Sequence, residues 1–464
     1  MDILIILFAL IFLIFVAYRG FSVILFAPVA ALMAVLFTNP GLVLPFYSGL
    51  FMEKMVGFIQ LYFPVFLLGA IFGKLIAMAG FAKSITAFTL RIFGSERAIL
   101  AIVVVGAVLT YGGVSLFVVA FAIYPFAAEL FKGARIPKRL IPATVALGAF
   151  TFTMDAFPGS PQIQNIIPTS FFNTDAWAAP WLGLSGGFFI FILGMAYLNW
   201  QKRKAAKAGE GYGENHVNEP DEMEVEHLPS PGIAIVPLAL VGICNKVFTG
   251  LIPQYYGPLF DFEEFGYQGI PQLDISKLTA IWAVEISLLI GILAVVVLAF
   301  YQIKRNFNAE INTAVIGALV ATLNTASEYG FGAVIAALPG FKALSDGISS
   351  TFTNLLVNEA VTVTVLSGIT GSASGGMSIA LAAMHETYLA QAAALGISNE
   401  VLHRVASMAS GGMDTLPHNG AIITLLLVTG LTHKQSYKDI FVITVLKTAG
   451  VFFIIVLYYL FGMV

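Results

Sequence analysis

Long apolar runs recur along the whole chain. About 20 apolar residues in a helix cross the ~30 Å hydrocarbon core of a bilayer. Eight uninterrupted runs approach or exceed this length, at residues 3–18, 20–38, 56–80, 180–200, 232–252, 277–302, 313–339 and 437–463. The pattern therefore predicts an all-α polytopic membrane protein.

Four further apolar segments are interrupted near their middles. Segments 138–171 and 399–430 contain proline, glycine and polar residues where a helix would be at mid-membrane, which predicts two broken helices. Segments 97–131 and 350–395 have centres rich in glycine and serine. They predict two re-entrant hairpins, which turn inside the membrane and leave by the side they entered.

Composition supports a membrane environment and narrows the class of function. The 464 residues are 58% hydrophobic and only 11% charged, with a mean hydropathy of +0.90, whereas about a quarter of the residues in soluble domains are charged. The net charge of −3, without a basic cluster beyond short loops, argues against nucleic acid as a partner. Cys244 is the single cysteine, so no intrachain disulfide can form. The first apolar run lacks a signal-peptide cleavage pattern, and we interpret it as a retained span.

Lysine and arginine gather in alternate loops. Basic loops occur at 19, 83–97, 132–139, 202–207, 304–305 and 434–438, whereas loops 39–54, 172–179 and 253–275 carry little or no basic charge. Basic loops beside spans stay in the cytoplasm. Ten crossings and two hairpins satisfy this rule, with both chain ends outside. We therefore expect a multi-pass protein of the cell inner (plasma) membrane.

The two halves of the chain repeat each other at a fixed offset of 259 residues. This offset places Gly112 on Gly371, and the string MDAFP at 154–158 on MDTLP at 413–417. Each copy would have five crossings and one hairpin, and an odd number of crossings requires the second copy to be inverted. The predicted domains are a first inverted repeat at 1–200, a cytoplasmic linker at 201–231 and a second inverted repeat at 232–464.

The interruptions form the expected substrate site. Non-helical backbone inside a membrane is tolerated only where it faces protein or a water-filled cavity. Helix N-termini at two facing breaks would form a cradle for a carboxylate, and nearby hydroxyls and amides suit a ligand with hydroxyl groups. The alternative is that glycine and serine only permit close helix packing. The candidate substrate-binding residues are Gly112, Gly113, Ser115, Asp155, Ser160, Gln162, Gln164, Asn165, Gly371, Ser372, Ser374, Asp414, His418 and Asn419.

Three acidic residues are candidates for ion coupling, because a carboxylate at the bilayer centre costs about 2.5–3.5 kcal/mol on the insertion scale. Asp155 and Asp414 open the two broken-helix motifs, where they serve either as helix caps or in coupling. Glu328 lies in a polar string at 324–328, inside a span whose repeat mate is apolar. This asymmetry makes Glu328 the preferred proton carrier.

Other titratable residues are weaker candidates. His418 follows Pro417 in the second break and can carry a proton near neutral pH, although a lone histidine is more often only a hydrogen-bonding group. Glu285 and Glu359 are expected to pair with neighbouring polar groups or to line a vestibule. The scattered histidines lack metal-ligand spacing, so neither a metal nor a cofactor is expected.

Enzyme and channel functions fit the sequence less well. Zinc-protease, phosphate-loop and serine-hydrolase motifs do not occur. Two aspartates in the membrane would also suit an aspartyl protease with a shared proton. However, their repeat-related positions suit a symmetric binding site at least as well. A passive channel would need a continuous polar stripe, which the spans do not show.

Three long strings carry a family resemblance: YGGVSLFVVAF at 111–121, MDAFPGSPQIQN at 154–165 and SGGMDTLPHNG at 410–420. Through them the chain resembles the gluconate:proton symporter (GntP) family of the ion-transporter superfamily over nearly its full length. It is most similar to members described as 3-hydroxybutyrate permeases. The resemblance implies proton-coupled uptake of a hydroxy-monocarboxylate, with 3-hydroxybutyrate ranked slightly above gluconate, and a homodimer. Sodium-coupled relatives have Ser-Asn-Thr at their hairpin tips, which this chain lacks, so sodium coupling is the alternative.

Overall fold

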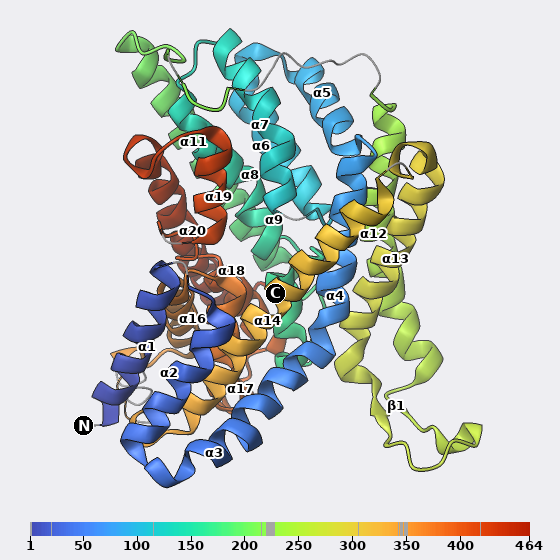
Figure 1. The fold of residues 1–464 in the computed structure, drawn as a ribbon, viewed down its shortest axis with the longest axis vertical. Helices are drawn as coiled ribbons and strands as arrows, with labels where there is room; N and C mark the ends of the chain where they lie inside the picture. The colour runs from blue at the N-terminus through green and yellow to red at the C-terminus, as the bar shows by residue number, and fades with distance from the viewer. Residues whose placement is uncertain are drawn as a thin grey trace.

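The described residues of the computed structural model form mostly α-helices, together with one two-stranded antiparallel β-sheet (Figure 1). The structure describes residues 2–464 except positions 20, 115, 215, 220–227, 305, 342, 344–346, 348–350 and 418. The first half contains α1 (Asp2–Tyr18), α2 (Val23–Thr38), α3 (Val43–Pro45), α4 (Met52–Met78), α5 (Phe81–Phe93), α6 (Ala98–Tyr111), α7 (Leu116–Gly133), α8 (Ile141–Ala149), α9 (Phe152–Asp155), α10 (Ile163–Phe172) and α11 (Pro180–Lys207). The second half contains α12 (Pro231–Tyr256), β1 (Leu259–Phe260), β2 (Leu273–Asp274), α13 (Ile275–Ile303), α14 (Phe307–Ala337), α16 (Leu355–Thr370), α17 (Ala373–Leu395), α18 (Asn399–Ser410), α19 (Gly420–Thr429) and α20 (His433–Phe461).

Each predicted uninterrupted span coincides with a helix. Among the described residues, five helical segments are long and apolar enough to cross a membrane: Pro40–Met78, Pro180–Lys207, Pro231–Tyr256, Ile275–Ile303 and His433–Phe461. The first of these continues from the short turns η1 (Pro40–Leu42), α3 and η2 (Phe46–Phe51) into α4. The predicted all-α polytopic class is confirmed.

Helix α5 was not expected from the hydrophobic pattern. The sequence predicts a basic loop here, because the segment carries Lys83 and Arg91. In the structure these two side chains are exposed, while Phe81 and Ile85 are buried on the other face. An amphipathic helix of this kind has its signal in the period of 3.6 residues and not in its mean hydropathy.

Both predicted hairpin segments are pairs of packed helices joined by a tight turn. α6 leads into α7 through Gly113, which has a φ of 92°, and α16 leads into α17 through Gly371, which has a φ of 64°. Glycine adopts this left-handed region at no steric cost. The turns therefore fall where the sequence concentrates its glycines.

Both predicted broken helices are interrupted. The first is broken between α9 and α10, where Pro158 and Pro161 lack the amide needed to continue a helix and Gly159 has a φ of 78° beneath the Trp177 ring. The second is broken between α18 and α19, at a stretch that contains Gly411, Gly412 and Pro417. Backbone groups in these stretches must find partners outside a helix.

The offset of 259 residues also relates the helix boundaries. Shifted by this offset, α6 covers 357–370 and α8 covers 400–408, and the structure has α16 at Leu355–Thr370 and α18 at Asn399–Ser410. The α6–α7 pair lies in the upper half of Figure 1 and the α16–α17 pair in the lower half. The domain boundaries and the inversion of the second repeat remain predictions.

The linker between α11 and α12 packs onto the ends of other helices. We call residues 210–214 and 216–219 the linker segment. Glu219 accepts a hydrogen bond of 2.6 Å from the fully buried Lys138, and the Asn218 side chain donates to the Val428 carbonyl at 2.6 Å. Glu210 pairs with Arg139, whose pKa is raised mainly by that hydrogen bond. The linker segment therefore joins the start of the first broken helix to the end of α19.

Candidate site at the crossing of the two helix breaks

The two interrupted helices cross each other at Asp155. Its backbone carbonyl lies in the first break and accepts hydrogen bonds from Ser407 (2.7 Å) and Arg404 (3.3 Å), both on α18. Gly411, which begins the second break, lies directly beneath the Asp155 carboxylate. A Cβ atom at that position would overlap Asp155 Oδ2. Only glycine permits this approach, so the two breaks form one site.

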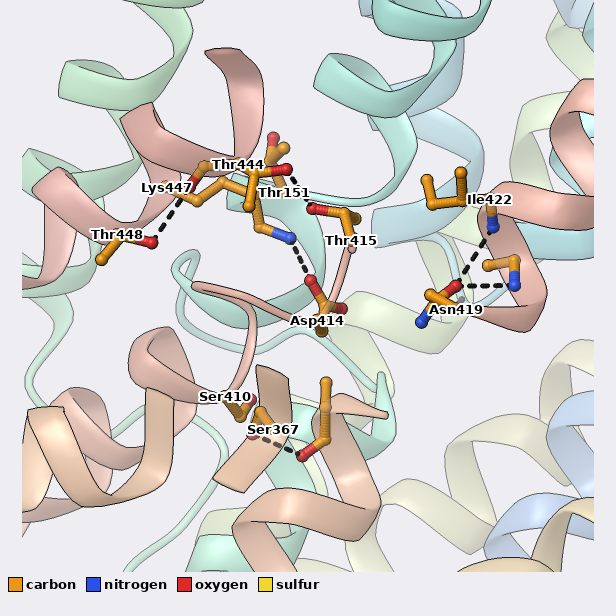
Figure 2. Close-up of polar contacts among 12 residues, drawn as sticks. Thr151, Ser367, Ser410, Asp414, Thr415, Asn419, Ile422, Thr444, Lys447 and Thr448 are labelled. Atoms are coloured by element: carbon orange, nitrogen blue, oxygen red, sulfur yellow. Dashed lines mark hydrogen bonds and ion pairs between the residues drawn. The ribbon is translucent and has the colours of Figure 1, made fainter. Parts of the chain in front are cut away.

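An ion pair lies inside the crossing. Lys447 of α20 donates to Asp414 Oδ1 at 2.7 Å, and both side chains are almost completely buried. Figure 2 shows Lys447 reaching Asp414 from α20, with Thr415 and Thr444 paired beside it at 2.7 Å. A buried ion pair is costly to form, but losing one partner costs more because the other charge is left unpaired.

Asp155 is the other acid of this site. It is 2% exposed, and its Oδ2 has no hydrogen-bond partner among the described residues. Its carboxylate interacts electrostatically with three charged side chains: Lys447, Asp414 and Arg404. The crossing therefore contains two acids and two bases, whose charges sum to zero when all four are ionised. We call Asp155, Asp414, Lys447 and Arg404 the central cluster.

Arg404 connects α18 to the first break and to the loop that follows α10. Its guanidinium donates to the carbonyls of Ala178 and Asp155 and to Asn165 Oδ1. Next to it, His403 Nε2 lies 3.3 Å from Asn165 Oδ1, and its Nδ1 lies 2.6 Å from Thr174 Oγ1. Because an amide oxygen only accepts, Nε2 carries the proton and Nδ1 accepts from Thr174.

Most polar candidates of the first break are engaged within the protein. Ser160 donates to the Thr153 carbonyl, and Asn165 donates to the carbonyls of Ser160 and Ala176. Gln162 donates to the carbonyls of Thr110 and Val114 at the α6–α7 turn. Gln164 is buried, and its Oε1 has no partner among the described residues. Gln162 thus fixes the first hairpin to its break.

The α6–α7 turn itself is tightly packed. A Cβ on Gly112 would overlap Leu238 of α12, and one on Gly113 would press against Pro161. Tyr111 donates to the Pro158 carbonyl at 2.7 Å. Gly112 and Gly113 therefore permit close helix packing here, which is the alternative to a role in substrate binding. Ser115 and His418 lie outside the described residues.

The second hairpin is fixed to its break in a similar way. Asn419 caps α19 by accepting from the amides of Ala421 and Ile422, and its Nδ2 donates to the Gly371 carbonyl at 2.6 Å. Ser372 caps α17 by accepting from the Gly375 amide. In both repeats, a side-chain amide of the break thus binds a carbonyl at the hairpin turn.

Glu328 lies on α14 beside the first turn of α17. It is 5% exposed, and a Cβ on Gly375 would overlap its Oε2. Among the described residues no hydrogen bond or ion pair holds its carboxylate, although Thr325 and Ser374 lie nearby with their hydroxyls 3.4 Å apart. The structure thus places Glu328 at the second hairpin and not in the central cluster.

The sequence interpretation missed the two bases of the central cluster. Lys447 lies in the middle of the last apolar run, and Arg404 lies at the start of the second broken helix. A basic residue inside a span is as costly as an acidic one and therefore equally informative. A search for every charge within the spans, and not only for acids, would have found both.

A cavity of about 640 Å³ opens beside the first break. Its walls come from the loop 173–180, α12, the start of α13 and the start of α18, and include Asp175, Trp177, Lys246 and Glu400. The Lys246 ammonium lies 4.7 Å from the centre of the Trp177 ring. Burial raises the pKa of Asp175, while the Trp177 amide and Lys246 oppose this rise. Within the described part of the chain, no group of three or more His, Cys, Asp or Glu could hold a metal ion.

The fold is that of a membrane transporter. It matches the YdaH transporter of Alcanivorax borkumensis with a TM-score of 0.51 over 89% of this chain and 88% of that one, at 16% identity. It matches Neisseria gonorrhoeae MtrF, described as illuminating a class of antimetabolite efflux pumps, with a TM-score of 0.50 over 87% and 82%, at 12% identity. No family profile matches the sequence.

Comparison with curated protein sequences identifies the transporter family to which the chain belongs. The chain is 59% identical to the uncharacterized transporter YxjC of Bacillus subtilis (strain 168), over 100% of both chains. It therefore belongs to the family of that transporter, and it is a multi-pass membrane protein. Membership of a transporter family supports a role in membrane transport and favours transport over the protease alternative.

Proposed function

We propose that the protein is a secondary active transporter that takes up a small hydroxy-monocarboxylate together with a proton. The observation that carries this proposal is the central cluster, which is buried at the crossing of the two breaks and is neutral when all four side chains are ionised. A carboxylate that enters adds one negative charge to a site from which water is largely excluded. A proton taken up together with it offsets this charge in the protein as a whole, so each ligand favours binding of the other.

The substrate class rests on two further supports. The motifs at 111–121, 154–165 and 410–420 resemble the gluconate:proton symporter family, whose members take up hydroxy acids. Hydroxyl groups of Thr325, Ser372 and Ser374 gather at the second hairpin, beside the start of α17. They suit a hydroxylated ligand, and a short 3-hydroxy acid ranks above gluconate. The same resemblance supports two inverted repeats and a homodimer of the cell inner membrane.

Two carboxyl groups are candidates for carrying the coupled proton. Glu328 is buried, and no charged partner lies near it in the described part of the chain, so it is stable in the membrane only when protonated or bound to a cation. One carboxylate oxygen of Asp155 has no hydrogen-bond partner within the described ranges, but Asp155 lies close to two bases. We favour Glu328, because Asp155 is already compensated by the central cluster.

Uptake into proteoliposomes tests the function directly. We expect an inward proton gradient to drive accumulation of labelled 3-hydroxybutyrate, and gluconate more weakly, at equal sodium on both sides. A sodium gradient at equal pH should drive none. Failure to accumulate either acid under both gradients would refute the proposed substrate class. Accumulation only with sodium would refute proton coupling.

A further inference from the structure

Asp155 and Asp414 occupy equivalent positions of the two repeats, since the offset of 259 residues relates them. Both are buried at the crossing of the breaks, one in each break. Two facing carboxylates at membrane depth form a natural position for a cation, because unpaired carboxylates there would repel each other and lose their hydration. The question is which cation occupies it.

Lys447 supplies a positive charge at this position. Its Nζ lies 2.7 Å from Asp414 Oδ1. Its Cε lies 3.4 Å from the point where a Cβ of Gly411 would stand, and that same point would overlap Asp155 Oδ2. Lys447 therefore passes beside Gly411, next to Asp155, and pairs with Asp414. The residue at the equivalent position of the first repeat is Phe188, so the first repeat has no counterpart of Lys447.

We propose that the Lys447 ammonium is a built-in cation that takes the place of a bound sodium ion at Asp414, next to Asp155. This inference rests on the proposed transport function. The charged groups that face Asp155 are Lys447 from α20, Asp414 from the second break and Arg404 from α18. The Arg404 guanidinium donates its hydrogen bonds to backbone carbonyls and to Asn165. Lys447 is therefore the base of the central cluster that pairs directly with a carboxylate.

A tethered ammonium differs from a bound ion in one functional respect. It stays in the site during the whole transport cycle and is independent of the ion concentration on either side. The central cluster therefore neither needs nor releases sodium, and the only cation it can exchange with water is a proton. We therefore expect that this site of the wild-type protein does not couple to sodium.

Thermal unfolding of the purified protein tests this inference without substrate. The protein is measured in NaCl and in choline chloride at equal ionic strength. Wild type should show the same Tm in both salts. Lys447→Met leaves Asp414 without its ion-pair partner, next to the second acid Asp155, so its Tm should be lower in choline and should rise with Na+ to a plateau. The double variant Lys447→Met with Asp414→Asn removes both charges of the pair and should not respond to Na+.

Either of two results would overturn the inference. One is a sodium-specific rise of Tm in the wild type, which remains decisive even if Lys447→Met cannot be purified. The other is a folded Lys447→Met variant that shows no response to Na+. Because neither readout uses a substrate, absence of hydroxy-acid uptake would refute the proposed function and leave this result unaffected.

Discussion

Arg404 has the largest side chain among the fully buried residues. Its guanidinium satisfies the carbonyls of Ala178 and Asp155 and the amide oxygen of Asn165. Arg404→Ala would leave the Ala178 carbonyl without its donor, would remove one of the two donors to the Asp155 carbonyl and to Asn165 Oδ1, and would remove one base from the central cluster. We expect a loss of about 3–5 kcal/mol in the free energy of unfolding, which thermal unfolding in detergent would measure as a lower Tm.

Arg203→Ala provides the matched control, since Arg203 is exposed near the end of α11. Its effect should stay within about 0.5 kcal/mol. If both variants unfold at the same temperature as the wild type, Arg404 does not hold the first break in place.

Glu328→Gln imitates a permanently protonated side chain. We expect accumulation driven by a proton gradient to be abolished, while exchange of internal for external substrate continues. Exchange does not require the carrier to return with this group deprotonated. Uptake and exchange assays in proteoliposomes separate the two activities.

Glu285→Gln on α13 serves as its control, because it neutralises another acid of a membrane span that lies outside the crossing. This variant should retain both activities. Concentrative uptake by Glu328→Gln would show that the proton is carried elsewhere, and Asp155 would be the next residue to test.

The acids of the site could be found from the sequence because they lie in repeated motifs. Asp155 and Asp414 both follow a methionine and precede a proline by three positions, so the offset alone identified them. The partners of these acids could not be found in this way. The offset of 259 residues relates Lys447 to Phe188 and Arg404 to Val145, so no repeated motif marks these two bases.

At the scale of elements, Gly411→Ala should disturb the crossing itself. The added methyl group would overlap Asp155 Oδ2, and the two breaks would have to separate. We expect a loss of about 1–3 kcal/mol in the free energy of unfolding and a loss of transport. Thermal unfolding and uptake assays measure the two effects.

Gly317→Ala is the contrasting variant. Gly317 lies inside α14 with no atom within 4 Å of its added Cβ. Alanine favours a helix over glycine by about 1 kcal/mol, so this variant should be as stable as the wild type or more stable. If Gly411→Ala behaved like Gly317→Ala, the breaks would not be in close contact.

Helix breaks could be predicted from the sequence better than amphipathic helices. Proline and glycine act locally, and they mark both breaks and both hairpin turns. The signal of helix α5 is the 3.6-residue period of its apolar positions, which a search for long apolar runs does not detect. Pairing of Gln162 and Asn419 with the hairpin turns, by contrast, depends on tertiary packing.

At the scale of the whole molecule, the inverted repeat predicts that the two hairpins open to opposite sides of the membrane. Lys132 lies near the end of α7 and Leu395 at the end of α17, and both are exposed. In a Cys244→Ser background, we expect Lys132→Cys to react with an impermeant thiol reagent only from the cytoplasm and Leu395→Cys only from outside. Labelling of both from one side would refute the inversion.

The linker segment has a practical consequence for experiments on this protein. Lys138 is fully buried beneath Glu219, and the Val217 carbonyl lies so close to Gly430 that a Cβ there would overlap it. A fusion tag or a protease site inserted at 210–219 would displace these contacts from both halves of the chain. A fluorescent reporter is better inserted in the exposed loop between β1 and β2. Gly269 is one such position, since no atom lies within 4 Å of an added Cβ there.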